Sequence, residues 1–271
     1  MTLLKYPRTR HIEGSRLQTG DLKDDKPIAE LRDAHLTIEE KVDGANCAIS
    51  FTDGQLMLQS RGHYLTGGYR ERHFDMLKTW ANVHLTRLQA VLGARYVMYG
   101  EWMYAKHTVF YDQLPHYFME FDVYDRETRL FLSTAARRDL LTDLPIMPVP
   151  VVHDGAIRTA ADINNLIKPS LYKSANWRDA LDKAAVVSGS RADFVARQTE
   201  DSDLAEGLYI KVEPAGSVTE RFKYVRHDFL QAIEASEGHW QDRPILPNQL
   251  AEGVDIFAPV LGVKGAYDET A

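Results

Sequence analysis

The sequence predicts an α+β fold in which antiparallel sheets are flanked by helices, and three patterns lead to this expectation. Residues 35–60 alternate apolar and polar side chains around two glycine turns, which is typical of strands joined by a sharp turn and a hairpin. From Tyr69 to Leu92 the apolar residues recur at helical spacing. Residues 207–213 and 220–225 return to the alternation of strands.

The other expected elements follow from turn and capping residues. Ser133 suits the N-cap of a helix that runs through Leu141. The stretch from Thr159 to Asp162 resembles a capping box for a helix that ends before Pro169. We expect further strands at 95–102, 117–124 and 130–132, a proline-rich connector at 145–150, and helices within 176–200 and 227–236.

The length of 271 residues suits one large domain. We expect a catalytic domain at 1–236 with an N-terminal extension at 1–34, followed by a short tail at 237–271. No apolar run approaches the roughly 20 residues of a membrane span, so we expect no membrane partner. The single cysteine, Cys47, excludes an intrachain disulfide and favours a reducing, cytoplasmic location.

The formal net charge is −7, which argues against a nucleic-acid footprint over the whole surface. Basic residues nevertheless gather in three segments. Residues 5–16 are interpreted as a solvated face, whereas 61–72 interleaves arginines with tyrosines and 221–226 lies on a predicted strand. Arg70 and Arg72, in the second segment, are the candidates for gripping a nucleic-acid strand.

The functional interpretation centres on the tetrapeptide Lys41-Val42-Asp43-Gly44, which lies between two predicted strands. A lysine at a strand end beside a glycine turn lies where the backbone can approach a ligand closely. Lysine has an ordinary pKa of about 10.4 and must lose its proton before it attacks as a nucleophile. We expect nearby cations and partial burial to lower the pKa of Lys41. The alternative is a surface lysine that precedes an Asp-Gly turn.

Further motifs follow this lysine in order, and they are Ser60-Arg61-Gly62, Tyr99-Gly100-Glu101-Trp102, Phe118-Met119-Glu120-Phe121-Asp122, Glu206-Gly207-Leu208-Tyr209-Ile210-Lys211 and Arg221-Phe222-Lys223. Over about Glu39 to Lys223, the chain resembles the six collinear motifs of the covalent nucleotidyltransferase superfamily, which contains DNA ligases, RNA ligases and mRNA capping enzymes. Asn46 after the glycine, the Gly-Glu-Trp form of the third motif, and the surroundings of Arg61 and Phe121 are most similar to nick-sealing RNA ligases. That branch includes RNA-editing ligases and bacterial relatives.

The resemblance implies an adenylyltransferase fold and a three-step reaction with ATP and Mg²⁺ or Mn²⁺. A lysyl-adenylate forms first, AMP then moves to an RNA 5′-phosphate, and a 3′-hydroxyl finally displaces AMP. The implied substrate is a nicked duplex or an RNA 3′ end in a hybrid, in RNA repair. An end-healing kinase or phosphatase is a possible partner.

The matched residues receive roles by this resemblance. The catalytic candidates are Lys41, Asp43, Asn46, Glu206, Lys211 and Lys223. The nucleotide-binding candidates are Glu39, Glu40, Gly44, Arg61, Glu101, Phe121, Lys211, Arg221 and Lys223, and the choice between Glu39 and Glu40 for the adenine amino edge stays open. The candidates for a hydrated metal ion are Asp43, Glu101 and Glu206.

Strand geometry constrains two of these pairs. Glu206 and Lys211 are five residues apart, so they face opposite sides of a strand unless Gly207 redirects the first carboxylate. Arg221 and Lys223 are two apart and share a face. Similar proteins more often carry lysine at the first of these positions, and Arg221 keeps the charge with a different geometry.

Two other interpretations compete with an RNA ligase. One is an ATP-dependent DNA ligase or a capping guanylyltransferase. We expect neither, because the residues after Lys223 are too few for the C-terminal oligonucleotide-binding barrel and lack an Arg-x-Asp-Lys element. The other is a non-catalytic protein that binds nucleotide or RNA on the same fold. The presence of every charged motif position argues against it.

Overall fold

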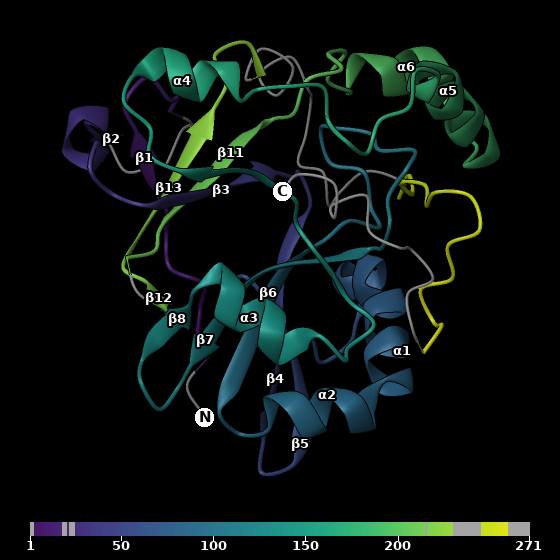
Figure 1. Cartoon of the computed structure of the whole chain (residues 1–271). Coiled ribbons are helices and arrows are strands. Elements are labelled where there is room, and N and C mark those ends of the chain that lie inside the picture. The colour runs from purple at the N-terminus through teal and green to yellow at the C-terminus, as the bar shows by residue number, and fades with distance from the viewer. Residues whose placement is uncertain (1–2, 18–20, 22–24, 215, 230–244, 260–271) are drawn as a thin grey trace.

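Two sheets lie one above the other, with helices on their outer faces and at one side (Figure 1). This computed structural model describes residues 3–17, 21, 25–214, 216–229 and 245–259. Within them the first sheet has the order β10 (Val151–Gly155), β3 (Leu36–Lys41), β11 (Gly207–Val212), β13 (Glu220–Val225), β1 (Arg10–Ile12) and β2 (Asp25–Lys26). The second has the order β12 (Ser217–Val218), β8 (Leu130–Leu132), β7 (Phe118–Asp125), β6 (Tyr96–Trp102), β4 (Ala45–Thr52) and β5 (Gln55–Ser60), with β9 (Met147–Pro148) beside β7.

The helices of the described residues are short. They are η1 (Ile28–Leu31), η2 (Tyr69–Phe74), α1 (Asp75–Val83), α2 (Leu85–Leu92), α3 (Thr134–Leu141), α4 (Ala160–Asn165), α5 (Trp177–Val187) and α6 (Ala192–Arg197). In Figure 1, α4 covers the upper sheet, α1 and α2 flank the lower one, and α5 and α6 form a pair at the upper right. None of the described helices has the length and apolar character that crossing a membrane requires.

The predicted α+β class with antiparallel sheets is confirmed, and most pairs of strands are antiparallel. The parallel pairs formed by β1 and by β9 were not foreseen. Ser133 caps α3 by accepting a hydrogen bond from Ala136, and Thr159 forms the expected capping box of α4. The single helix expected at 69–92 is divided into η2, α1 and α2. Most of the helix expected at 227–236 lies outside the described residues.

Strand alternation decides which residues reach the space between the sheets. On β3, Leu36 and Ile38 point outward into an apolar cluster that also contains Ile163 of α4. The alternate residues of β3 therefore point inward, and these include Glu39 and Lys41. A larger cluster fills the second sheet and its helices, and burial of such apolar area stabilises the fold by roughly 25 cal/mol per Å².

The N-terminal extension belongs to this core. Strand β1 pairs in parallel with β13, bringing His11 beside Lys223. Tyr6 is buried in the apolar cluster of the second sheet, where its ring contacts that of Phe121. The segment thus bridges the two sheets instead of forming a separate appendage.

Candidate active site

A cavity of about 200 Å³ opens between the two sheets, and we call it the inter-sheet cavity. The first sheet contributes residues of β3, β11 and β13, and the second contributes residues of β4, β6 and β7. The lining residues are Tyr6, Thr9, Glu39, Glu40, Lys41, Val42, Asn46, Arg61, Glu101, Phe121, Val149, Glu206, Tyr209, Lys223 and Val225. Most of the residues predicted to bind nucleotide are therefore brought together here.

Lys41 ends β3 and its Nζ atom lies 2.6 Å from Glu206 Oε1. Burial lowers the pKa of Lys41, but the carboxylates of Glu206, Asp43 and Glu101 outweigh burial and raise the pKa above its ordinary value. The expected lowering of this pKa is therefore wrong for this arrangement, because carboxylates rather than cations surround the ammonium. Lys41 is held as a cation against Glu206, and a lysine in this state must release a proton before it can act as a nucleophile.

Two glycines permit the close backbone approach on which this geometry depends. Gly207 lies opposite Lys41 in the sheet, and a Cβ atom built on it would lie 1.9 Å from the carbonyl oxygen of Tyr224. A Cβ on Gly44 would lie 2.7 Å from Met103 Sδ. Glu206 lies directly before Gly207 and outside β11, and its carboxylate turns to Lys41, so strand alternation does not keep it from the cavity.

The three carboxylates predicted to face a metal ion differ in their surroundings. Burial raises the pKa of Glu101 to about 8 and that of Glu206 to about 7. One oxygen of each is buried without a hydrogen bond inside the described part of the chain. Asp43 Oδ2 accepts the backbone N–H groups of Thr108 and Val109 at 2.7 and 2.8 Å.

These carboxylates do not form a ready-made set of direct ligands. Among the described residues, no group of three or more His, Cys, Asp and Glu side chains is placed to hold a metal ion. The buried oxygens of Glu101 and Glu206 do suit the waters of a hydrated dication, because each lacks a donor and burial disfavours its charge. The donor set thus fits an ion that also binds phosphate oxygens.

Lys211 lies below the cavity rather than on its wall. It is fully buried, and its Nζ atom is 3.0 Å from Glu39 Oε2 and 3.0 Å from Asp122 Oδ1. Arg137 of α3 enters the same cluster and bridges Glu39 and Glu120. Lys211 therefore contacts Glu39, which lines the inter-sheet cavity, but Lys211 itself does not line that cavity.

The two basic residues of the last motif, Arg221 and Lys223, differ in their position relative to the inter-sheet cavity. Lys223 lines the cavity, with Nζ 2.7 Å from Asp21 Oδ1. The Arg221 guanidinium lies 3.7 Å from the ring centre of Phe131 and 3.8 Å from Asp122 Oδ2, away from the lining. Arg221 and Lys223 do share a face of β13, as expected, but the contact with the Phe131 ring holds Arg221 against the second sheet.

The remaining nucleotide candidates occupy the wall in different ways. The pairing of β7 with β6 has a bulge at Phe121. Because of this bulge, the side chains of Phe121 and Asp122 both face the space between the sheets. Asn46 and Arg61 also line the cavity. Glu40 lines it too, but its carboxylate accepts a hydrogen bond from Ser170 at 2.5 Å.

Several residues of the site were not predicted from the sequence. Tyr6 donates a 2.5 Å hydrogen bond to Asp122 Oδ2, and its hydroxyl also contacts that of Tyr209. The alternation with Lys211 could have indicated Tyr209, and a lone arginine on the apolar side of α3 could have indicated Arg137. Nothing in the sequence around Tyr6 signals its place, because the contact is 116 residues away.

Comparison with known proteins shows solved structures with a similar fold. A solved RNA ligase of Naegleria gruberi, a lysine-to-alanine variant with ATP and Mn, matches with a TM-score of 0.53 and 17% identity, over 84% of this chain and 63% of that chain. A glutamate-to-alanine variant with AMP and Mn matches with a TM-score of 0.53 and 17% identity, over 87% and 66%. An aspartate-to-alanine variant without ligand matches with a TM-score of 0.53 and 16% identity, over 86% of this chain and 64% of that chain. The chain thus spans less than two thirds of these solved ligases, and a comparison with curated proteins gives no match.

The two facing sheets and the lysine between them define a covalent nucleotidyltransferase fold. The RNA ligase family matches residues 34–225, which is most of the chain. This protein therefore belongs to the RNA ligase family, and the family expected from the ordered motifs is confirmed.

Proposed function

We propose that this protein is an ATP-dependent RNA ligase that joins 3′-hydroxyl and 5′-phosphate ends through Lys41. The observation that carries the proposal is the Lys41 ammonium, 2.6 Å from Glu206 in a cavity that also contains Phe121 and Lys223. ATP and a divalent metal ion are the cofactors, as in the solved ligase that contains ATP and Mn.

In the first step, Lys41 Nζ forms a bond to the α-phosphorus of ATP while the bond to pyrophosphate breaks. Glu206 accepts the ammonium proton, which suits a carboxyl group whose pKa is raised to about 7 by burial. Lys223 balances the charge of the phosphates after it leaves Asp21. Phe121 offers a ring to the adenine, where stacking contributes about 1–3 kcal/mol.

In the second step, an oxygen of the RNA 5′-phosphate attacks the AMP phosphorus, and the bond to Lys41 breaks. In the third, the 3′-hydroxyl attacks the 5′-phosphate and AMP leaves. Asn46, on the cavity wall beside Glu101, donates its amide to a phosphate oxygen in these sealing steps. A hydrated dication held near Glu101 and Glu206 supplies charge neutralisation when bound.

We further propose that the substrate is an RNA nick, held by a complementary strand or by a partner that heals RNA ends. The net charge of −7 leaves few phosphates that the described surface can neutralise, so free-strand affinity should be weak. Bringing two free ends together costs chain entropy, which a bridging strand removes in advance. Single-turnover sealing of a nicked duplex should therefore exceed circularisation of the same strand, and equal rates would reject this substrate preference.

The central test is Lys41→Ala. With radiolabelled ATP and Mg²⁺, the wild type should form an acid-labile AMP adduct, whereas Lys41→Ala should form none and should not seal 5′-phosphorylated RNA. Lys183→Ala removes an exposed lysine on α5 and is the matched control. An adduct that persists in Lys41→Ala would show that another residue is the nucleophile. Failure of the wild type to form any adduct would favour a non-catalytic binding protein.

A further inference from the structure

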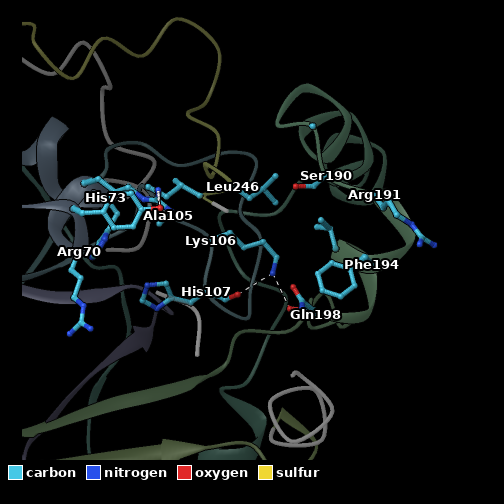
Figure 2. Close-up of a pocket in the computed structure, with 15 residues that line it drawn as sticks. Arg70, His73, Ala105, Lys106, His107, Ser190, Arg191, Phe194, Gln198 and Leu246 are labelled. Atoms are coloured by element: carbon cyan, nitrogen blue, oxygen red, sulfur yellow. Dashed lines mark hydrogen bonds between the residues drawn. The ribbon is translucent and has the colours of Figure 1, made fainter. Parts of the chain in front are cut away.

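A second cavity, of about 290 Å³, lies between two walls on the side of the molecule that carries α5 and α6. We call it the helix-side cavity. Figure 2 shows Arg70, His73 and His107 on one wall, with Ser190 and Phe194 on the other. The first wall consists of η2 and the loop at 105–107, and the second consists mainly of the loop at 189–191, between α5 and α6, and of α6 itself.

The charge of this cavity is opposite to that expected for an acidic protein. Arg70, Arg72 and Lys106 line it, and the described lining residues include no carboxylate. Glu71 lies between the two arginines, but it is buried and turned to the backbone N–H of Gly67 at 2.7 Å and to the Lys78 ammonium at 3.0 Å. The carboxylate therefore leaves the positive charge of both arginines at the surface. Such a cluster favours a polyanion.

Aromatic rings accompany the cations. Tyr69 is 77% exposed, and the Arg72 guanidinium lies 4.3 Å from its ring centre. Phe194, 43% exposed, faces the opposite side of the same cavity. Exposed rings beside arginines are suited to stacking on the bases of a single strand, while the cations hold its phosphates.

The two walls are fastened to each other. Lys106 Nζ donates hydrogen bonds to the carbonyl oxygens of His107, on its own wall, and of Gln198, on the other, each at 3.0 Å, and Figure 2 shows the second contact reaching Gln198 at the end of α6. The backbone N–H of Lys106 also donates to Leu246 at 2.8 Å. The cavity is thus a preformed site, which reduces the ordering cost of binding.

The first wall also continues into the motif that carries Lys41. His107 Nδ1 lies 3.9 Å from Asp43 Oδ1, and the next two backbone N–H groups along the loop bind Asp43 Oδ2. Asp43 therefore lies between the helix-side cavity and Lys41. A strand that occupies this cavity therefore approaches Lys41 from the Asp43 side, whereas Phe121 and Lys223 lie in the inter-sheet cavity.

We propose that the helix-side cavity binds the RNA strand that carries the 3′-hydroxyl, with a phosphate at Arg70 and a base against Phe194. This assignment rests on the proposed ligase function and adds the place and the strand of its RNA substrate.

The first test measures RNA binding directly, with a nicked RNA duplex whose 3′-hydroxyl strand is fluorescently labelled. Arg70→Glu and Phe194→Ala should each weaken binding about fivefold or more, because a phosphate contact or a stacking contact is lost. Arg32→Glu makes the same charge change on an exposed residue beside η1, and Val187→Ala trims an exposed apolar residue of α5; both should bind as the wild type does. Equal affinities for all five proteins would overturn the proposal.

The second test identifies the strand. Photocrosslinks from 4-thiouridine placed near the nick should reach residues 69–73 or 190–198 from the 3′-hydroxyl strand, and crosslinks only from the 5′-phosphate strand would overturn the assignment. AMP-adduct formation should be equal in all the variants, because none of the changed residues lines the inter-sheet cavity. Absence of the adduct in the wild type would refute the proposed function alone, since binding and crosslinking are measured without it.

Discussion

Arg137 shows how a single buried residue can support a site that it does not enter. Its guanidinium is fully buried, and it bridges Glu39 and Glu120, while Lys211 holds the other side of Glu39. Burial of these like charges raises the pKa of Glu120 to about 7 even with the arginine present. Removal of Arg137 leaves carboxylates buried without their main partner.

Arg137→Met should therefore lower the free energy of unfolding by about 3–5 kcal/mol, as expected when one partner of a buried ion pair is lost. Urea denaturation followed by circular dichroism would measure the change. Arg138→Met removes an exposed arginine from the next position of α3 and should have little effect. Similar small changes in both variants would contradict the role of Arg137.

Glu40 makes stability depend on pH. Burial raises its pKa to about 7, which the hydrogen bonds from Ser170 and Leu171 only partly offset. Because the folded pKa is above the unfolded value, the stability contributed by Glu40 is complete below about pH 4.5 and is lost as the pH rises through 7. Wild-type stability should fall across this window more than that of Glu40→Gln. If the urea midpoints of the two proteins change equally between pH 5 and 8, Glu40 does not make stability depend on pH.

At the scale of elements, the contact between β11 and β13 sets the position of Glu206. Gly207→Ala places a methyl group 1.9 Å from the Tyr224 carbonyl, so the two strands must separate. The change should cost about 1–3 kcal/mol or more and should reduce AMP-adduct formation, because Lys41 pairs with Gly207. Gly62→Ala is the control, since a Cβ atom there has no neighbour within 4 Å among the described residues. Normal adduct yield and stability in Gly207→Ala would refute the argument.

Elements with local signals could be predicted from the sequence, and elements without them could not. Ser133 and Thr159 are capping residues that indicate the start of their helices, and the sequences of β11 and β13 alternate apolar and polar residues. By contrast, β1 has only three residues and owes its pairing to β13, more than 200 positions away. For the same reason the ordered motifs located Lys41, whereas Tyr6 and Arg137 enter through long-range packing.

At the scale of the whole molecule, the described part of the C-terminal segment returns to the loop that holds Asp43. Asn248 is buried, and its amide oxygen accepts the Tyr111 N–H at 3.0 Å while its amide nitrogen donates to the Met103 carbonyl at 2.7 Å. The Tyr111 hydroxyl in turn accepts the Asp43 N–H at 2.9 Å. Residues 245–259 thus stabilise the surroundings of Asp43 and, through them, those of Lys41.

Asn248→Ala should leave two buried backbone groups unpaired and lower the free energy of unfolding by about 1–3 kcal/mol for each. Because the Asp43 loop is loosened, the rate of AMP-adduct formation should fall as well. Gln249→Ala changes the neighbouring side chain and keeps the Asn248 contacts, so it is the control. If the two variants have the same denaturation midpoint and adduct rate, the segment has no such supporting role.

Helices α5 and α6 pack around a small apolar cluster of their own, in which Trp177, Leu181 and Val195 meet Phe110 and Leu246. The inward faces of α5 and α6 therefore pack in a cluster that is separate from the apolar clusters of the two sheets. Phe194 is exposed and does not line the inter-sheet cavity, so a substitution there leaves the surroundings of Lys41 unchanged. If the helix-side cavity binds RNA as proposed, exchanging this helical pair for another should change the RNA preference of the protein and leave AMP-adduct formation intact.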